Sequence, residues 1–328
     1  METKTRYHKY SRWEKGTGHT VEINKTDLDY LMALFTHGDL STAMLHQLVR
    51  PHSKQDNTTN RLRDLKRDPR DLIIQPKQQR AGYNANYKPL VYRLSLKGLD
   101  LLLARGRITR EHVDLYMRLR QNYHHFHHDY VTSYLTASIE IGTRAQAETR
   151  FIPWHEILTS EKCPIDTQEA LNPLHIIYKP HNDKKRERAI VPDALLGVEI
   201  QGKKQYFVLE TDCATEAIQS TSIDNSSILG KLHAYCEIYK EQMYKTHFGI
   251  SNMRVLIVTT MHTHLVGMTK RIEALAKENK IAGTRPFLFQ SVPYMAKEEN
   301  KPIPTGHLFT VPYKRVRFPD VYINILDQ

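Results

Sequence analysis

The chain has 328 residues, of which 40% are hydrophobic and 25% charged, a composition typical of a globular protein long enough for two domains. No apolar run approaches the roughly 20 residues of a membrane-spanning helix, and the basic N-terminus lacks the apolar core of a secretory signal. Three scattered cysteines without a CxxC pair argue against a disulfide framework and against a thiolate zinc site. We therefore expect a cytoplasmic protein that is not inserted in a membrane.

Most of the positive charge is concentrated in one stretch of the chain. Residues 50–97 contain 12 Lys or Arg against four Asp, which accounts for most of the formal net charge of +11. Such a concentration favours a polyanionic partner such as DNA, although a solvated basic surface would give the same count. The elements predicted in this stretch favour the first interpretation.

The N-terminal third predicts three helices, a hairpin and a further helix. Apolar residues recur at helical spacing in the first of them, at Leu28, Leu31 and Leu34. In chain order, the elements are helices at 25–38, 39–49 and 53–67, strands at 71–79 and 88–95 around a Gly- and Asn-rich loop at 81–87, and a helix at 95–106. This is the order of a winged helix-turn-helix, and we assign residues 1–110 to such a DNA-binding domain.

The helix predicted at 53–67 carries the side chains expected of a DNA reader. Its polar face combines cationic and amide groups, which contact phosphates and base edges. The residues that we assign to DNA binding are Lys54, Gln55, Asn57, Thr58, Asn60, Arg61, Arg63 and Lys66. The alternative is a small helical lid with a basic face, but a purely structural helix would carry more Glu.

Two histidine pairs offer one kind of metal site. Tyrosine relaxases and rolling-circle nucleases use a His-hydrophobe-His pair on a strand, which "HFH" (125–127) and "HTH" (262–264) resemble. The surroundings of the first pair predict a helix, on which its two histidines would point apart, and the second pair has Thr between its histidines. We expect instead that His128 and Asp129 lie at the start of a helix that packs on the catalytic core.

The stretch "YFVLETDCATE" (206–216) ends an apolar strand in a cluster of carboxylates. It is predicted to pair with a strand at 189–200 through a turn at 202–204, so that the two form a hairpin. Glu210 and Asp212 are two residues apart on a strand and therefore share a face. The hairpin brings Asp193, near the start of the first strand, close to both.

Three unpaired carboxylates at one end of a hairpin repel one another and lose solvation. A hard divalent cation such as Mg²⁺ or Mn²⁺ relieves both penalties, because it takes oxygen ligands at short distances. The alternative is that each carboxylate forms a salt bridge to one of the many Lys and Arg side chains. We favour a metal site formed by Asp193, Glu210 and Asp212.

A Pro-Asp pair ending at Asp193, with Glu210 on the next strand, resembles the PD-(D/E)xK superfamily of restriction-endonuclease-like nucleases. The resemblance implies that these acids and a lysine surround the scissile phosphate. The chain departs from the pattern at Asp212, where the superfamily has Lys. Some members take the lysine from the following helix, and Lys231, in the first turn of a helix predicted at 226–242, is the candidate.

The order of motifs is also similar to that of the replication-relaxation family: "HHDYVTSYL", "RFIPWHEIL", "VPDALLGVE", "YFVLETDCATE" and "LGKLHAYCEIY". With a winged helix in front, the whole resembles the MobC-type plasmid mobilisation relaxases. The catalytic series that the resemblance implies is Asp193, Glu210, Asp212, Glu216 and Lys231. It further implies a metal-dependent, site- and strand-specific nick at a transfer origin, made by hydrolysis, with residues 111–328 forming the nuclease-like domain.

The remainder of the chain predicts a strand at 254–260, a helix at 267–280 and a strand at 285–292. The fold class that we expect is α+β, with an N-terminal winged helix-turn-helix followed by a restriction-endonuclease-like α/β core with a mixed sheet. Basic segments at 179–188 and 313–318 suit a channel for a phosphate backbone. The expected partners are double- and single-stranded DNA at a transfer origin, an accessory relaxosome protein and a coupling protein.

Two other functions stay open. Because Asp212 replaces the motif lysine, the core is also compatible with an inactive nuclease-like fold in a DNA-binding regulator of plasmid replication or transcription. A tyrosine relaxase that uses either histidine pair would instead leave the protein covalently attached to a DNA end.

Overall fold

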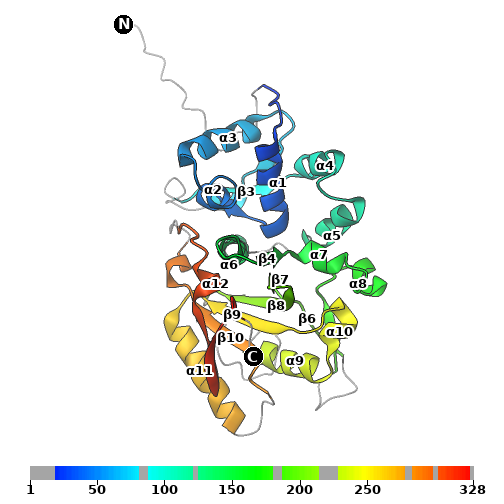
Figure 1. Ribbon diagram of the computed structural model, residues 1–328, viewed down its shortest axis with the longest axis vertical. Coiled ribbons are helices and arrows are strands. Elements are labelled where there is room, and N and C mark those ends of the chain that lie inside the picture. Colours follow the sequence, from blue (N-terminus) through cyan, green and yellow to red (C-terminus); the bar gives the residue numbers. More distant parts are fainter. Residues whose placement is uncertain are drawn as a thin grey trace.

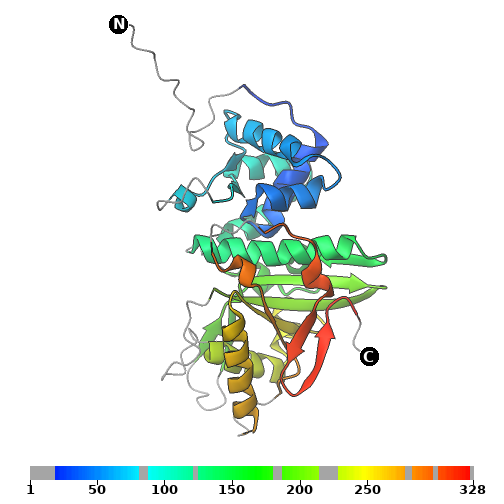
Figure 2. The same ribbon diagram turned by 90° about the vertical axis from the view of Figure 1, so that its left-hand side faces the viewer.

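The computed structural model describes residues 19–80, 88–120, 125–179, 187–213, 228–277, 283–297 and 302–325. These residues form a mixed α+β fold with twelve α-helices and a seven-stranded mixed sheet. The N-terminal helices lie at one end of the molecule and the sheet towards the other (Figure 1), with a long helix between them, seen from the side in Figure 2. None of the helices in these ranges is both long and apolar enough to cross a lipid bilayer.

The N-terminal unit follows the predicted order of helices and strands. Its elements are α1 (Lys25–His37), β1 (Leu40–Ser41), α2 (Thr42–Val49), α3 (Gln55–Arg67), β2 (Ile73–Ile74), β3 (Val91–Leu94) and α4 (Leu96–Ala104). Strand β2 is shorter than predicted, because it ends before Pro76, which has no N–H for a sheet hydrogen bond. The unpredicted β1 pairs with β3 and gives a small sheet of order β1-β3-β2. The loop predicted at 81–87 lies outside the described residues.

One seven-stranded sheet organises the rest of the chain, in the order β12-β11-β10-β9-β8-β7-β4. Its strands are β4 (Thr149–Ile152), β7 (Ala194–Ile200), β8 (Lys203–Asp212), β9 (Arg254–Thr259), β10 (Phe287–Ser291), β11 (Pro312–Arg315) and β12 (Phe318–Tyr322). Strands β8, β9 and β10 are parallel to one another, and the other neighbours are antiparallel. The strands predicted after the hairpin are confirmed as β9 and β10.

Helices cover both faces of this sheet. One face carries α6 (Phe126–Arg144), and the other carries α9 (Ile228–Lys240) and α11 (His262–Lys277) (Figure 2). Helix α6 also contacts α1 and α2, so it lies between the N-terminal unit and the sheet. The shorter helices are α5 (Arg110–Arg120), α7 (Trp154–Leu158), α8 (Ile165–Glu169), α10 (Met243–Phe248) and α12 (His307–Thr310).

Side-chain alternation along β8 assigns its residues to the two faces. Phe207 and Leu209 pack in the hydrophobic cluster that includes α6, whereas Val208 packs in the cluster that includes α9. Because both faces are covered, this part of the strand is a continuous apolar run. By the same alternation, Thr211 contacts α6 and Glu210 contacts α9. Glu210, the first carboxylate of β8, therefore lies on the face of the sheet that α9 covers.

The predicted domain division after residue 110 falls at the first residue of α5. Tyr30 of α1, Tyr134 of α6 and Phe207 of β8 nevertheless belong to one hydrophobic cluster. The N-terminal unit thus packs on the sheet through a shared buried interface. The division itself stays a prediction.

The hairpin predicted from the sequence is present as β7–β8, with two differences. Its turn is Gln201–Gly202, where both residues have positive φ (50° and 77°), as a tight turn between twisted strands requires. The strand predicted at 189–200 is divided, because β7 begins only after Pro192. The preceding residues form β6 (Arg188–Ile190), which pairs with β5 (Ile176–Tyr178) in a separate ribbon.

Candidate active site and nucleic-acid interface

Two of the predicted carboxylates meet at the open end of the β7–β8 hairpin. Asp193 directly precedes β7, and its backbone N–H donates to the carbonyl oxygen of Leu209 at 3.0 Å. Its Oδ2 accepts a hydrogen bond from the backbone N–H of Thr211 at 2.7 Å. Glu210 lies between these two contacts on β8. The hairpin thus places Asp193 beside Glu210, as the sequence predicts.

The Glu210 carboxylate is buried, with 4% of the residue exposed. Tyr235 of α9 donates its hydroxyl to Oε1, and the Lys231 Nζ, one turn earlier, lies 3.0 Å from Oε2. Burial raises the pKa of Glu210 to about 7; Lys231 opposes this rise and Asp193 adds to it. The lysine predicted to replace the motif lysine therefore lies against this carboxylate.

His128 of α6 contacts the other carboxylate. Its Nε2 lies 3.2 Å from Asp193 Oδ2 and 3.2 Å from the Thr211 carbonyl oxygen. Burial lowers the pKa of His128, but hydrogen bonds with Asp129 and Asp193 outweigh it and raise the pKa to about 10. Burial raises the pKa of Asp193. The hydrogen bond from His128 is the largest of the effects that oppose burial, and together these effects bring the pKa of Asp193 below its ordinary value. The predicted helix start at His128 and Asp129 is confirmed, and it supplies a cation to the site.

Asp212 does not join this pair. Its Oδ2 accepts a hydrogen bond from the Thr259 hydroxyl at 2.8 Å and lies 3.0 Å from His264 Nδ1, so it is engaged by β9 and α11. Glu210 and Asp212 both line a void of about 10 Å³, at the lower limit for one water molecule. In the part of the chain that the structure describes, no group of three or more His, Cys, Asp or Glu could hold a metal ion. The predicted convergence of three carboxylates is therefore reduced to two.

The two remaining carboxylates fit a divalent cation by their chemistry. Both side chains are oxygen donors, and they lie close enough for the Asp193 charge to contribute to the raised pKa of Glu210. A cation between them would replace this repulsion by attraction. Glu216, the remaining acid of the predicted series, lies outside the described residues.

Neither histidine pair forms a strand-type metal site. His125 immediately precedes α6 and His127 is in its first turn, while the other pair begins α11. On a helix, residues two apart point in different directions. His262 Nδ1 lies 3.3 Å from Ser291 Oγ, and His264 lies against Asp212. Neither pair lies on a strand: the helix predicted around the first pair is confirmed, and the second pair begins the helix that follows β9.

A large cleft adjoins the carboxylate pair. It measures about 1040 Å³ and is lined by the end of α1, the end of α5, the first turns of α6 and the start of β7. Asp193 and Lys231 are among its lining residues. The candidate site is therefore open to a ligand of considerable size, since ligand pockets commonly measure about 300–1,000 Å³.

A family model matches residues 31–252, about two thirds of the chain, and describes the replication-relaxation family. The chain belongs to the replication-relaxation family. No curated protein and no solved structure matches it. The part of this replication-relaxation protein that matches extends from α1 to α10 and includes Asp193, Glu210 and Lys231. Membership of this family suggests a role in replication or relaxation.

The replication-relaxation protein presents one face of α3 to the solvent. Among the residues predicted to bind DNA, the exposed ones are Lys54, Gln55, Asn57, Asn60 and Arg63. Lys66 is half-exposed. Thr58 differs, because it is fully buried. Its hydroxyl lies 2.9 Å from the Tyr30 hydroxyl and 3.0 Å from His46 Nδ1. Thr58 thus belongs to the core between α1, α2 and α3 and not to the predicted DNA-binding face.

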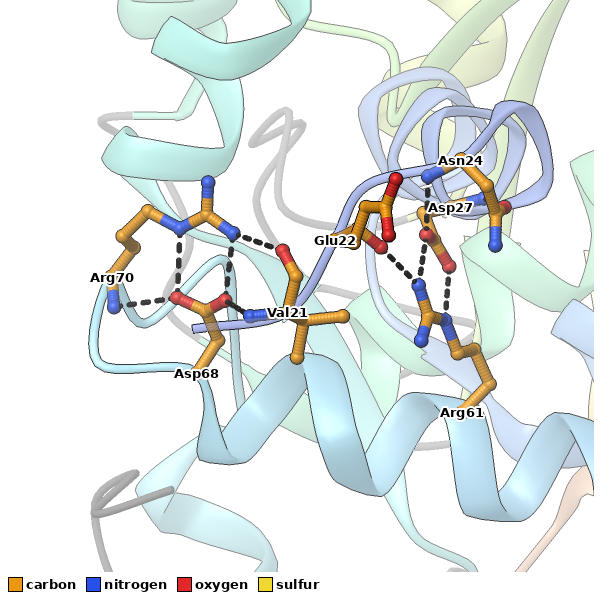
Figure 3. Close-up of polar contacts among 7 residues, drawn as sticks. All are labelled: Val21, Glu22, Asn24, Asp27, Arg61, Asp68 and Arg70. Atoms are coloured by element: carbon orange, nitrogen blue, oxygen red, sulfur yellow. Dashed lines mark hydrogen bonds and ion pairs between the residues drawn. The ribbon is translucent and has the colours of Figure 1, made fainter. Parts of the chain in front are cut away.

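Arg61 also has a structural role in place of the predicted DNA contact. Its Nε donates to Asp27 Oδ1 at 2.6 Å, and Asp27 is fully buried. At the other end of α3, Asp68 accepts a hydrogen bond from the Val21 N–H at 2.7 Å and pairs with Arg70. Figure 3 shows both arginines turned towards the segment that precedes and begins α1. These ion pairs fix the position of α3, which leaves its exposed residues to contact a ligand.

Proposed function

We propose that this protein is a relaxase of the MobC type, a metal-dependent nickase that cuts one strand at a specific site in a plasmid transfer origin. The observation that carries the proposal is the meeting of Asp193, Glu210 and Lys231 beside a large cleft. An antiparallel hairpin, then a helix, then a parallel strand is also the order that the restriction-endonuclease-like core would have. Membership of the replication-relaxation family supports the same assignment.

In this proposal, Asp193 and Glu210 hold Mg²⁺ or Mn²⁺ through their carboxylate oxygens. A bound ion of this kind supplies Lewis-acid stabilisation of a phosphate and lowers the pKa of a water ligand. Asp212 is assigned a positioning role, because its Oδ2 connects the end of β8 to Thr259 of β9 and His264 of α11.

The other side chains orient the carboxylates and stabilise charge. Lys231 brings a positive charge to the place where phosphate oxygens gain negative charge. Tyr235 fixes the orientation of Glu210 through its hydroxyl hydrogen bond. His128 holds Asp193, and because it is already protonated it does not accept a proton from the attacking water. Hydrolysis forms a bond from water oxygen to phosphorus as one phosphate ester bond breaks, which leaves one phosphate end and one hydroxyl end.

The N-terminal unit would supply the site specificity as a winged helix-turn-helix. Exposed cationic and amide side chains of α3, such as Gln55, Asn57 and Arg63, are of the kinds that contact phosphates and base edges. Duplex binding by this unit would position the flanking DNA so that one strand reaches the cleft. An accessory relaxosome protein and a coupling protein are the partners that such a function requires.

Nicking of supercoiled plasmid DNA that carries the transfer origin tests the proposal. We expect Mn²⁺-dependent conversion to the open circular form, which EDTA abolishes. The nicked ends should be free of protein, because the proposed reaction is hydrolysis. Protein covalently attached to one DNA end would instead indicate a tyrosine relaxase, and would overturn the proposal.

A second candidate function is a DNA-binding regulator of plasmid replication or transcription with an inactive core. The observation that favours it is the absence of a third metal-binding side chain among the described residues. A regulator would still bind the origin through α3. It would leave supercoiled DNA intact at any Mn²⁺ concentration.

A further inference from the structure

The N-terminal unit and the sheet are joined by a buried polar contact at the end of α1. His37, the last residue of α1, has a side chain with no exposed surface, and each of its ring nitrogens lies beside a side chain of α6. Its Nδ1 lies 2.9 Å from the Thr136 hydroxyl, and its Nε2 lies 2.6 Å from Glu140 Oε2. One residue of the N-terminal unit is therefore held by two successive turns of the long helix.

The backbone around His37 is attached to the same part of the molecule. The Ser133 hydroxyl of α6 donates to the His37 carbonyl oxygen at 2.6 Å and accepts from the Asp39 N–H at 3.0 Å. From the start of α7, the Trp154 indole N–H donates to the Thr36 carbonyl oxygen at 3.0 Å. We refer to these hydrogen bonds, together with those of the His37 side chain, as the His37 joint.

A second contact between the two parts lies at the end of α2. Arg144, one turn after Glu140 on α6, pairs with Glu140 and donates to the Leu48 carbonyl oxygen. Burial raises the pKa of Glu140, but the hydrogen bond with His37 is the largest of the effects that lower it to about 2. The Glu140 carboxylate is therefore ionised at neutral pH and connects the ends of both helices to α6.

The His37 joint is embedded in a buried apolar interface. Tyr30 and Leu34 of α1 lie in one hydrophobic cluster with Tyr134 and Leu135 of α6. Domains of one chain move relative to one another unless the interface between them is large and hydrophobic. The buried hydrogen bonds restrict such motion further, because a shift of the interface would leave polar groups without partners. We therefore expect the N-terminal unit and the sheet to move as one body.

This body connects the two surfaces on which the proposed function depends. The hydroxyls of Tyr30 of α1 and Thr58 of α3 lie 2.9 Å apart, so α1 holds α3. At the start of α6, His128 lies 3.2 Å from Asp193. Figure 2 shows α6 running between the N-terminal helices and the sheet. The connection from α3 to Asp193 thus passes through two packed helices and not through a linker.

We propose that the His37 joint holds α3 at a fixed distance and orientation from the pair Asp193 and Glu210, so that the duplex bound by α3 determines which phosphodiester bond reaches the pair. His37 and Glu140 are then specificity-determining residues, although neither contacts the reacting atoms. A flexible linker between the same units would let several neighbouring bonds reach the site. The proposal rests on the proposed function for the roles of α3 and of the carboxylate pair, and it adds the means by which the cut bond is selected.

The distance between two spin labels tests the rigidity without DNA or metal. The labels are attached to Asn60→Cys on α3 and Lys270→Cys on α11, both exposed positions, in a protein whose three native cysteines are replaced by Ala. These two helices lie towards opposite ends of the molecule (Figure 1). We expect pulsed electron spin resonance to give one narrow distance distribution. A broad distribution, or several distances, would overturn the proposal.

Two variants weaken the His37 joint. The double variant His37→Phe, Glu140→Met keeps an aromatic ring against Phe151 and removes both members of the buried pair. Ser133→Ala removes the hydroxyl that holds the backbone, and it takes the place of the double variant if that protein does not fold. Each should broaden the distance distribution. Arg150→Ala, which breaks ion pairs within the sheet unit, is the control and should leave it narrow. An unchanged distribution in both weakened variants would contradict the role of the joint.

The spacing itself is measured on a linear duplex that carries the transfer origin, with no Mn²⁺ added. An iron–EDTA reagent on His125→Cys, an exposed position at the cleft, cuts DNA by hydroxyl radicals where the cleft meets it. Protection that Arg63→Ala removes marks the place where α3 binds. We expect radical cuts centred at one spacing from that place, and cuts at several spacings when the joint is weakened. Cuts spread equally in both proteins would overturn the proposal. This result is independent of whether the protein nicks DNA.

Discussion

Replacement of Glu210 by Gln tests the electrostatics of the candidate site without DNA or metal. The amide keeps the shape of the side chain and can still accept the hydrogen bond from Tyr235. It removes a buried charge whose pKa is raised from 4.5 to about 7, chiefly by burial. Because the native carboxyl keeps its proton to higher pH than the unfolded chain does, its ionisation destabilises the fold as the pH rises through this range.

The size of the effect follows from the two pKa values. The difference between 4.5 and about 7 corresponds to about 3 kcal/mol of unfolding free energy, of which about 2.5 kcal/mol appears between pH 5 and pH 8. The wild-type protein should lose this amount over that interval through Glu210, and Glu210→Gln should not. The difference in unfolding free energy between variant and wild type should therefore shift by about 2.5 kcal/mol in favour of the variant.

Urea unfolding followed by circular dichroism at pH 5 and pH 8, with EDTA present, measures this shift. Glu199→Gln is the matched control, because Glu199 lies on the neighbouring strand and pairs with Arg150 at the surface. It should change stability by less than about 1 kcal/mol at either pH. A Glu210→Gln variant that is less stable relative to wild type at pH 8 than at pH 5 would refute the reasoning. That result would mean that the ionised carboxylate stabilises the fold.

Three further outcomes are expected. Lys231→Met keeps the packing of the stem and removes the charge, so single-turnover nicking should slow by at least about tenfold, some 1.4 kcal/mol; full activity would show that another cation serves. Arg63→Ala should weaken duplex binding and lower the log–log salt slope by about 0.9, measured by anisotropy, with unchanged stability. Arg61→Ala leaves the buried Asp27 without its partner and should lower the unfolding free energy by about 2 kcal/mol or more; unchanged stability would contradict the structural role of this pair.

Features set by neighbouring residues could be predicted from the sequence. The apolar strands and the tight turn between them define the β7–β8 hairpin, and the hairpin alone brings Asp193 beside Glu210. The position of Lys231 could also be predicted. The helix after β8 must cover the sheet, and the first turn of this helix begins near the end of β8, where Glu210 lies. The resemblance to the replication-relaxation family is confirmed by the family match.

Contacts between distant segments could not be predicted in this way. Asp212 is engaged by Thr259 and His264, which are 47 and 52 positions away and reach it only because β9 lies parallel to β8. Thr58 and Arg61 read as part of a polar helix face, but their partners lie on other helices or before α1. A helical pattern shows which side chains are polar. It does not show which of these polar side chains are buried in the core or held in an ion pair.

The rates of plasmid nicking by Asp193→Asn and Asp212→Asn, measured side by side with Mn²⁺, test the central claim most directly. Asp193 is assigned to the reacting centre with Glu210, so Asp193→Asn should abolish nicking while origin binding by the N-terminal unit stays nearly intact. Asp212→Asn retains an oxygen acceptor for Thr259 and should keep most of the activity. Nicking that persists in Asp193→Asn, or that is lost only in Asp212→Asn, would contradict the assignment of the active site.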